Sequence, residues 1–276
     1  TGSPATSNTI TMTVNAIPAT ATITPGGPTT FCAGGSVLLT SSAATGNQWY
    51  KDNVLLSGET NQTYTATASG SYTVVVTENG CPSLPSAATV VTVNPNLPVS
   101  VTIAAAPGNT ICAGTSVTFT ATPTNGGGAP TYQWYNGATP ISGETGVTYT
   151  SSTLVNGDAI SVQLTSNATC ATGSPATSNT ITMTVNAIPA TPTITPGGPT
   201  TFCAGGSVLL TSSAATGNQW YKDNVLISGE TNQTYSATTS GSYTVVVTEN
   251  GCPSLPSAAT VVTVNPIPAT PTITPG

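Results

Sequence analysis

The chain has 276 residues, including 28 glycines and 23 prolines, and carries a formal net charge of −6 because only two lysines oppose eight acidic residues. So few cations argue against nucleic-acid binding and against attraction to an anionic membrane, since both need clustered Lys or Arg. No run of eighteen apolar residues occurs, so no membrane insertion is expected. Abundant Ser, Thr, Gly and Pro, without apolar residues at helical spacing, predict an all-β chain.

Internal repetition sets the expected domain organisation. Residues 1–95 recur at 172–266, and a longer related unit lies between the copies. Self-similarity of this kind is typical of an array of small units. We therefore expect three domains: module A at 19–95, module B at 96–188 and module A′, a repeat of module A, at 189–266.

Both ends of the sequence are expected to lie inside further domains. Residues 1–18 match residues 172–189, the end of module B, and are expected to be the final strand of another B-type domain. Residues 267–276 are expected to be the first strand of a following domain. The sequence is accordingly interpreted as an excerpt of a longer secreted protein.

Alternating apolar residues between Gly, Pro, Asn and Asp turns predict the strands of module A. These strands are expected at 22–24, 36–40, 48–51, 63–67, 71–78 and 87–93. Six or seven short strands with frequent turns are typical of a β-sandwich. Each module has one tryptophan, Trp49, Trp134 or Trp220, and we expect the core of each sandwich to form around that indole.

Module A resembles immunoglobulin domains at two places. Trp49 stands where the core tryptophan of the third strand is found, and Ala68-Ser69-Gly70-Ser71-Tyr72 resembles the tyrosine corner. The string FCAGGSVLLT…QWYKDN…SGSYTVVVTENGC is similar to the Ig-like and PKD-like tandem repeats of large Bacteroidota secreted surface proteins, which include adhesion and gliding proteins exported by the type IX route. Module A′ repeats both features with Trp220 and Tyr243.

Module B looks like a sister repeat, although Ile160 replaces the corner tyrosine and no tyrosine corner is expected there. The resemblance implies tandem immunoglobulin-like β-sandwich domains arranged as a rod. It also implies an extracellular protein or one on the bacterial cell surface.

Six cysteines, two in each module, predict disulfides in an oxidising compartment. In a sandwich of this topology the two cysteines of one module lie at opposite ends of strands about 20–25 Å long, whereas disulfide Cα atoms lie within about 7 Å. Bonds between neighbouring modules are therefore favoured: Cys32–Cys170 and Cys112–Cys252, which leaves Cys81 and Cys203 for flanking units. The alternative is a bond within each module: Cys32–Cys81, Cys112–Cys170 and Cys203–Cys252.

No catalytic residue, cofactor or metal site is expected. Histidine is absent, and the eight acidic residues are scattered at turns. We expect a non-catalytic structural repeat segment of an extracellular bacterial filament or adhesin stalk, whose partners are neighbouring copies or domains of the same protein, head to tail. The alternative is a carbohydrate- or surface-binding module that uses Tyr50, Tyr135 and Tyr221, which follow the tryptophans and face the opposite way.

Two further features have candidate roles. Asn61, Asn167 and Asn232 begin glycosylation sequons and are candidate glycosylation sites; the alternative, which we favour, is that these asparagines are unmodified. Asn8, Ile10, Met12 and Val14 alternate along a strand that has no domain of its own. This strand could complete an open sandwich in a neighbouring chain by strand addition, or it could belong to one continuous polypeptide, and we favour the second interpretation.

Overall fold

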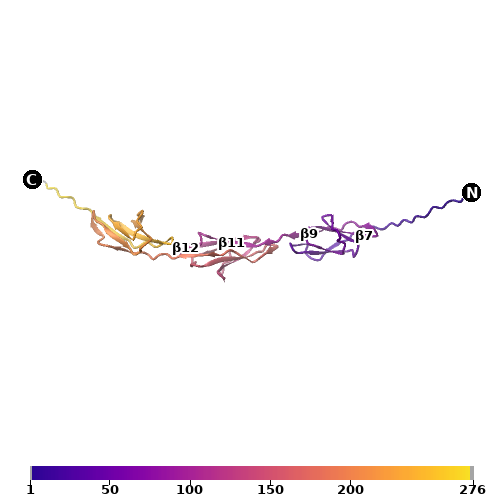
Figure 1. The fold of residues 1–276 in the computed structure, drawn as a ribbon, viewed down its shortest axis with the longest axis horizontal. Coiled ribbons are helices and arrows are strands. Elements are labelled where there is room, and N and C mark those ends of the chain that lie inside the picture. The colour runs from indigo at the N-terminus through magenta and orange to yellow at the C-terminus, as the bar shows by residue number, and fades with distance from the viewer. Residues whose placement is uncertain (1, 274–276) are drawn as a thin grey trace. The chain divides into compact units, whose positions relative to one another are not determined.

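A computed structural model describes residues 2–273, and every regular element among them is a β-strand (Figure 1). The all-β prediction is confirmed. The contacts group the chain into two units. Unit 1 comprises Thr1–Ser100, Thr124–Pro130 and Thr165–Ala176, and unit 2 comprises Val101–Pro123, Thr131–Leu164 and Thr177–Gly276.

Module A lies in unit 1 and folds as two sheets. The first sheet is antiparallel, in the order β1 (Ile23–Pro25), β3 (Val37–Ser41), β6 (Thr63–Ala66). The second has the order β2 (Thr30–Cys32), β9 (Thr89–Asn94), β7 (Gly70–Glu78), β4 (Asn47–Lys51), β5 (Val54–Leu55), with β8 (Cys81–Pro82) also paired to β7. Only β2 and β9 run parallel, with Thr30 opposite Thr92.

The core of module A follows from alternation along its strands. On β3, Val37 and Leu39 are buried, whereas Leu38 between them is exposed, since successive side chains point to opposite faces. The Trp49 side chain is fully buried, and its Nε1–H donates a hydrogen bond of 2.9 Å to the Asn61 carbonyl. The indole thus fills the core without leaving its polar atom unpaired.

An aromatic row connects the tryptophan to the start of β7. The ring of Tyr64 lies 5.8 Å from that of Trp49 and 5.5 Å from that of Tyr72, centroid to centroid. The Tyr72 hydroxyl donates to the Ala68 carbonyl at 2.8 Å, which is the hydrogen bond of a tyrosine corner. This bond fixes the chain just before β7 to the buried ring.

Module A′ lies in unit 2 and repeats this topology. Its first sheet is β22 (Ile194–Pro196), β24 (Val208–Ser212), β27 (Thr234–Ala237), and its second is β23 (Thr201–Cys203), β30 (Thr260–Asn265), β28 (Gly241–Glu249), β25 (Asn218–Lys222), β26 (Val225–Leu226), with β29 (Cys252–Pro253) on β28. The Tyr243 hydroxyl donates to the Thr239 carbonyl at 2.9 Å. Thr239 replaces Ala68 of module A, and its hydroxyl accepts a 2.9 Å hydrogen bond from Lys222.

Module B is built in the same manner around Trp134. One sheet is β11 (Ser100–Ala106), β13 (Val117–Thr124), β16 (Thr148–Ser151), and the other is β15 (Thr139–Pro140), β14 (Thr131–Asn136), β17 (Ala159–Thr165), β19 (Ala176–Thr177), with β20 (Ile181–Thr182) also on β17. A parallel pair joins β12 (Thr110–Cys112) to β21 (Thr184–Asn186). Trp134 packs near Phe119 and Tyr149, and Ile160 is fully buried.

The observed strands differ from the expected ones mainly in the short pieces. Strands β2, β5 and β8 were not anticipated, because two or three residues are too few to show an alternating pattern. Residues 2–22 and 266–273 form no strand, since a strand needs a hydrogen-bonded partner. Thr1 and residues 274–276 of the two expected end strands lie outside the described residues.

The corner hydrogen bond gives a stability prediction. Tyr72→Phe removes the donor to the Ala68 carbonyl and should lower the free energy of unfolding of module A by about 1 kcal/mol. Urea denaturation followed by tryptophan fluorescence measures it. Tyr50→Phe, on the outer face of the same sheet, is the matched control and should change stability by less than about 0.5 kcal/mol; equal effects of the two variants would contradict the corner's role.

Tyr72 also predicts how stability depends on pH. Burial raises the pKa of Tyr72 above its usual value of 10.0, and the nearby Tyr64 and Asp52 add to the rise. The folded state therefore keeps a proton that the unfolded state loses. The corresponding stability is fully present below pH about 10 and declines as pH rises toward the folded pKa. Urea midpoints measured below and above pH about 10 should fall with pH, and Tyr72→Phe should show a smaller fall than the natural sequence.

Candidate functional site

The first candidate site is a disulfide that joins module A to module B within unit 1. Cys32, at the end of β2, bonds Cys170, with the Cα atoms 5.4 Å apart. Cys170 sits in a turn with a φ of 64°, directly before β18 (Ala171–Thr172). The two cysteines are 138 residues apart in sequence, so the bond closes a long loop that contains most of both modules.

The linker between these modules is hydrogen-bonded to the same turn. Strand β10 (Leu97–Pro98) runs parallel to β18. The Leu97 N–H donates to the Cys170 carbonyl at 2.9 Å, and the Asn125 side chain donates to the Pro98 carbonyl at 2.7 Å. The disulfide and these bonds hold the linker against the cysteine-bearing end of module B.

The second site, within unit 2, joins module B to module A′ in the same way. Cys112, at the end of β12, bonds Cys252, the first residue of β29, with the Cα atoms 5.6 Å apart. The Asn186 side chain donates to the Asn250 carbonyl at 3.1 Å, and the Asn186 carbonyl accepts from the Ala113 N–H at 2.9 Å. Asn186 thus contacts both of the segments that the disulfide connects.

The structure brings together the two neighbour pairs and none of the pairs within a module. Each bond joins the first cysteine of one module to the second cysteine of the next, and Cys252 is almost completely buried. Cys81 and Cys203 carry free thiols; Cys81 is half-buried and Cys203 is exposed.

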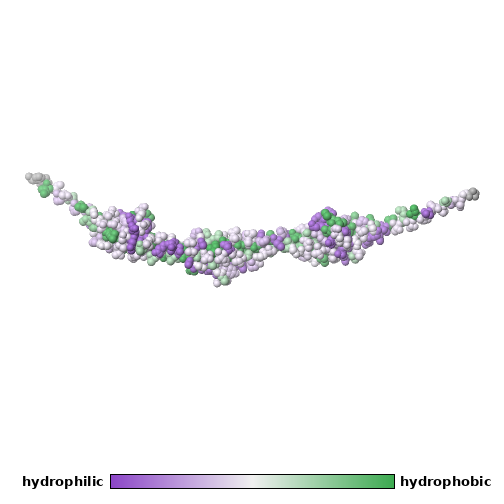
Figure 2. All heavy atoms as spheres, viewed as in Figure 1, coloured by the Kyte–Doolittle hydropathy of each residue, from purple (hydrophilic) through white to green (hydrophobic). Residues whose placement is uncertain are grey.

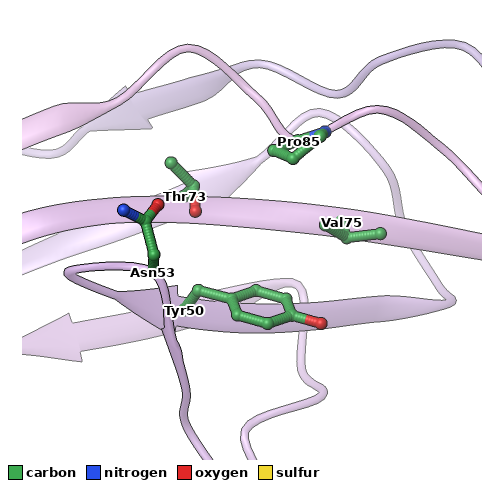
Figure 3. Close-up of a pocket in the computed structure, with 5 residues that line it drawn as sticks. All are labelled: Tyr50, Asn53, Thr73, Val75 and Pro85. Atoms are coloured by element: carbon green, nitrogen blue, oxygen red, sulfur yellow. The ribbon is translucent and has the colours of Figure 1, made fainter.

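The tyrosines that follow the tryptophans line shallow pockets on the outer face of the larger sheet. The pocket at Tyr50 has a volume of about 280 Å³ and is also lined by Asn53, Thr73, Val75 and Pro85. Figure 3 shows Tyr50 and Pro85 on either side of the strand that carries Thr73 and Val75. An aromatic ring and a proline therefore form the walls, with a threonine and an asparagine as the polar groups.

Module A′ repeats this pocket at Tyr221, with Asn224 and Pro256 in the corresponding places and a volume of about 260 Å³. The pocket at Tyr135 of module B is about 230 Å³ and has Ser161 and Gln163 instead of the threonine–valine pair. All three tyrosines are half-buried. The sequence predicts the tyrosines, but it gives no sign that Asn53, in a turn, and Pro85, between β8 and β9, lie beside Tyr50.

The three sequon asparagines are exposed. The Asn61 and Asn232 carbonyls accept the indole hydrogen bonds of Trp49 and Trp220, both at 2.9 Å. The Asn167 side-chain oxygen accepts from the Ala129 N–H at 3.1 Å. All three asparagines lie in loops between strands. Each makes a hydrogen bond to the rest of its module and is exposed to solvent.

The three aspartates, Asp52, Asp158 and Asp223, make local side-chain hydrogen bonds. The Ser71 N–H donates to Asp52 at 2.8 Å, and this bond, together with the Lys51 ammonium 3.1 Å away, lowers the pKa of Asp52 below its usual value of 3.8. Asp158 accepts from the Asn136 side chain and the Val155 N–H, both at 2.8 Å. Among residues 2–273, no three His, Cys, Asp or Glu side chains are grouped as metal ligands, and no helix is long and apolar enough to cross a membrane.

Two-layer sandwiches that each enclose one tryptophan, with a tyrosine corner in modules A and A′, define tandem immunoglobulin-like domains. The family described as "Ig-like domain CHU_C associated" matches residues 18–95 and 189–266, more than half of the chain. The chain therefore belongs to this family of Ig-like domains.

Solved structures with similar tandem arrays share little sequence with the chain. Domains 3–5 of the Drosophila OTK extracellular region are 15% identical, with a TM-score of 0.35, over 92% of this chain and 100% of that one. Domains A168–A170 of titin are 13% identical, with a TM-score of 0.37, over 83% and 93%. Three N-terminal domains of the bacteriophage RB49 outer capsid protein Hoc are 15% identical, with a TM-score of 0.33, over 90% and 99%. No curated protein matches the chain.

The bond between modules A and B can be tested by cutting the linker. A protease recognition site inserted after Asn96, between the two modules, should leave the cleaved fragments joined without reductant and release them with reductant, because Cys32–Cys170 spans the cut. Electrophoresis under both conditions measures this outcome. In Cys170→Ser the fragments should separate without reductant. Separation of the unmutated, non-reduced protein would show that Cys32 is not bonded to Cys170.

Proposed function

We propose that the chain is a non-catalytic structural repeat segment of an extracellular bacterial filament or adhesin stalk. One observation carries this proposal: both disulfides join neighbouring modules instead of closing a single module. A bond within a module stabilises that module alone, whereas a bond between modules keeps them attached when the linker is cut or the chain is pulled.

The bonding pattern also supports an extracellular location. Disulfides persist outside the reducing cytosol, and secreted domains use them widely. Cross-links that close long loops stabilise by roughly 2–5 kcal/mol, and the two loops here span 138 and 140 residues of sequence separation. The family match is to Ig-like domains. The sequence also resembles the tandem repeats of Bacteroidota surface proteins.

The contacts of the charged groups favour a structural role over an enzymatic one. Asp52 and Asp223 each hold a backbone N–H of the following strand, Ser71 and Ser242, at 2.8 Å. Asp158 ties together a turn of module B. These carboxylates are used in folding, and none of them faces the tyrosine pockets.

The proposal predicts where and in what form the native protein occurs. An antibody against the modules should label thin fibres or stalks on intact cells in electron micrographs, and external protease should remove the label. Free thiols in the native material should be few. Label confined to the cytoplasm, with all six cysteines reduced, would contradict the proposal.

A second function, carbohydrate binding, is favoured by one specific observation. The pocket of tyrosine, proline, threonine and asparagine recurs with the same residue types in modules A and A′. Sugar rings stack on aromatic faces, and small polar groups fix their orientation. We propose that neutral glycans of neighbouring surface molecules are the ligands of these pockets, which would let the segment hold to other surface material.

Substitution of the two pocket tyrosines tests this second function. The natural protein should bind a subset of neutral glycans on an array, and the double variant Tyr50→Ala/Tyr221→Ala should lose this binding while keeping its unfolding midpoint near the natural value. Tyr135→Ala in module B, whose pocket has different walls, is the matched control and should keep the binding. Absence of glycan binding by the natural protein would exclude the function.

A further inference from the structure

An eighteen-residue stretch occurs twice in the chain in two different environments. Residues 1–18 are identical to residues 172–189. The second copy contains the end of β18, which pairs with β10, and strands β19, β20 and β21, which pair with β17 and β12 of module B. Residues 2–18 of the first copy form no strand. The same sequence is therefore paired in strands in the second copy and forms no strand in the first.

The second copy shows what the stretch does when it is partnered. Met183 is 1% exposed; its N–H donates to the Asp158 carbonyl at 2.8 Å, and its carbonyl accepts from the Gly157 N–H at 2.9 Å. The Asn179 side chain both accepts from and donates to the backbone of Ile103, at 2.8 and 3.2 Å. These contacts hold the stretch as the last short strands of the module B sandwich, β19, β20 and β21.

In the first copy the corresponding side chains are in water. Ile10, Met12 and Val14 are 84%, 85% and 90% exposed and share one face, because alternate residues of an extended chain point the same way. Figure 2 shows hydrophobic atoms along this N-terminal segment. Three exposed apolar side chains on one face of a segment are typical of a strand that packs against another domain when it is bound.

The C-terminal end of the first copy makes the same contacts with module A as the second copy makes with module A′. The Asn15 side chain donates to the Asn79 carbonyl at 2.9 Å, as Asn186 does to Asn250 at 3.1 Å. The Cys81 sulfur lies 3.8 Å from the Asn15 carbonyl oxygen, and the Cys252 sulfur lies 4.0 Å from that of Asn186.

The two copies differ in the state of the cysteine beside their C-terminal ends. Cys252 is bonded to Cys112 of module B, whereas the corresponding Cys81 is a free, half-buried thiol. Among the described residues, this end of module A thus repeats the contacts that Asn186 makes with Asn250 and Cys252, without the disulfide and without a B-type sandwich to supply the second cysteine.

We infer that residues 5–15 form the last strand of a B-type β-sandwich with the sequence type of residues 97–171, and that this sandwich bonds its counterpart of Cys112 to Cys81. The bond forms when the two thiols lose two protons and two electrons to a disulfide oxidant such as oxidised glutathione, which leaves as two molecules of glutathione. This inference deepens the proposed structural function by naming the partner and its attachment site.

The test attaches the body of a B-type sandwich to the chain. A second copy of residues 97–171, with its Cys170 changed to Ser, is placed directly before Thr1, and the protein is folded in a glutathione redox buffer. Met12 and Met183 are then the only methionines, because the added segment has none. In the unextended chain, peroxide should oxidise Met12 well before Met183, as their exposures require.

In the extended chain Met12 should lose this excess reactivity and oxidise together with Met183, and mapping without reduction should find Cys81 bonded to the added Cys112. Met12→Lys in the extended chain is the matched control and should lose most of the bond, because the lysine would enter an apolar core. Unchanged Met12 reactivity, a Cys81 that remains a thiol, or an added segment that stays unfolded would each overturn the inference. These outcomes are independent of where the native protein is located, so they leave the test of the proposed function separate.

Discussion

The burial of one indole in each sandwich is the interaction on which the rest of the structure depends. Trp49, Trp134 and Trp220 are fully buried, and the indole N–H of each donates a hydrogen bond of 2.9 Å to a backbone carbonyl. A side chain of this size brings the two sheets together in a module of fewer than a hundred residues and positions the aromatic row beside it. Because the indole buries a large apolar surface and its N–H is hydrogen-bonded, each module has a core of its own.

A core held in this way leaves the cysteines available for other contacts. At the place where a disulfide would connect the two sheets of an immunoglobulin domain, module A packs Leu39 against the region of Val74, and both side chains are fully buried. The cysteines lie instead at the end of β2 and at the start of β8, just after the turn that follows β7. Because these positions are at the ends of the sandwich, they meet the next module, and the chain becomes a series of cores joined by covalent bonds.

The fold could be predicted from the sequence, but only part of the candidate sites could. The alternation of Tyr72, Val74 and Val76 and the identity of the two A modules indicated the sandwiches, since burial of one strand face dictates that pattern. The two disulfides of the structure are the pairs favoured from strand length and module ends. The sequence could not show the linker pairing of β10 with β18 or the convergence of Asn53 and Pro85 on Tyr50, because such contacts depend on turns whose course no short-range pattern records.

If covalent bonds run from module to module, mass-spectrometric mapping of the native protein, released from cells and never reduced, should detect them. We expect one cross-linked peptide that contains Cys32 and Cys170 and another that contains Cys112 and Cys252. Peptides that join Cys32 to Cys81 and Cys203 to Cys252 would contradict this pattern, because each module would then be closed on itself and the series would be held by its linkers alone.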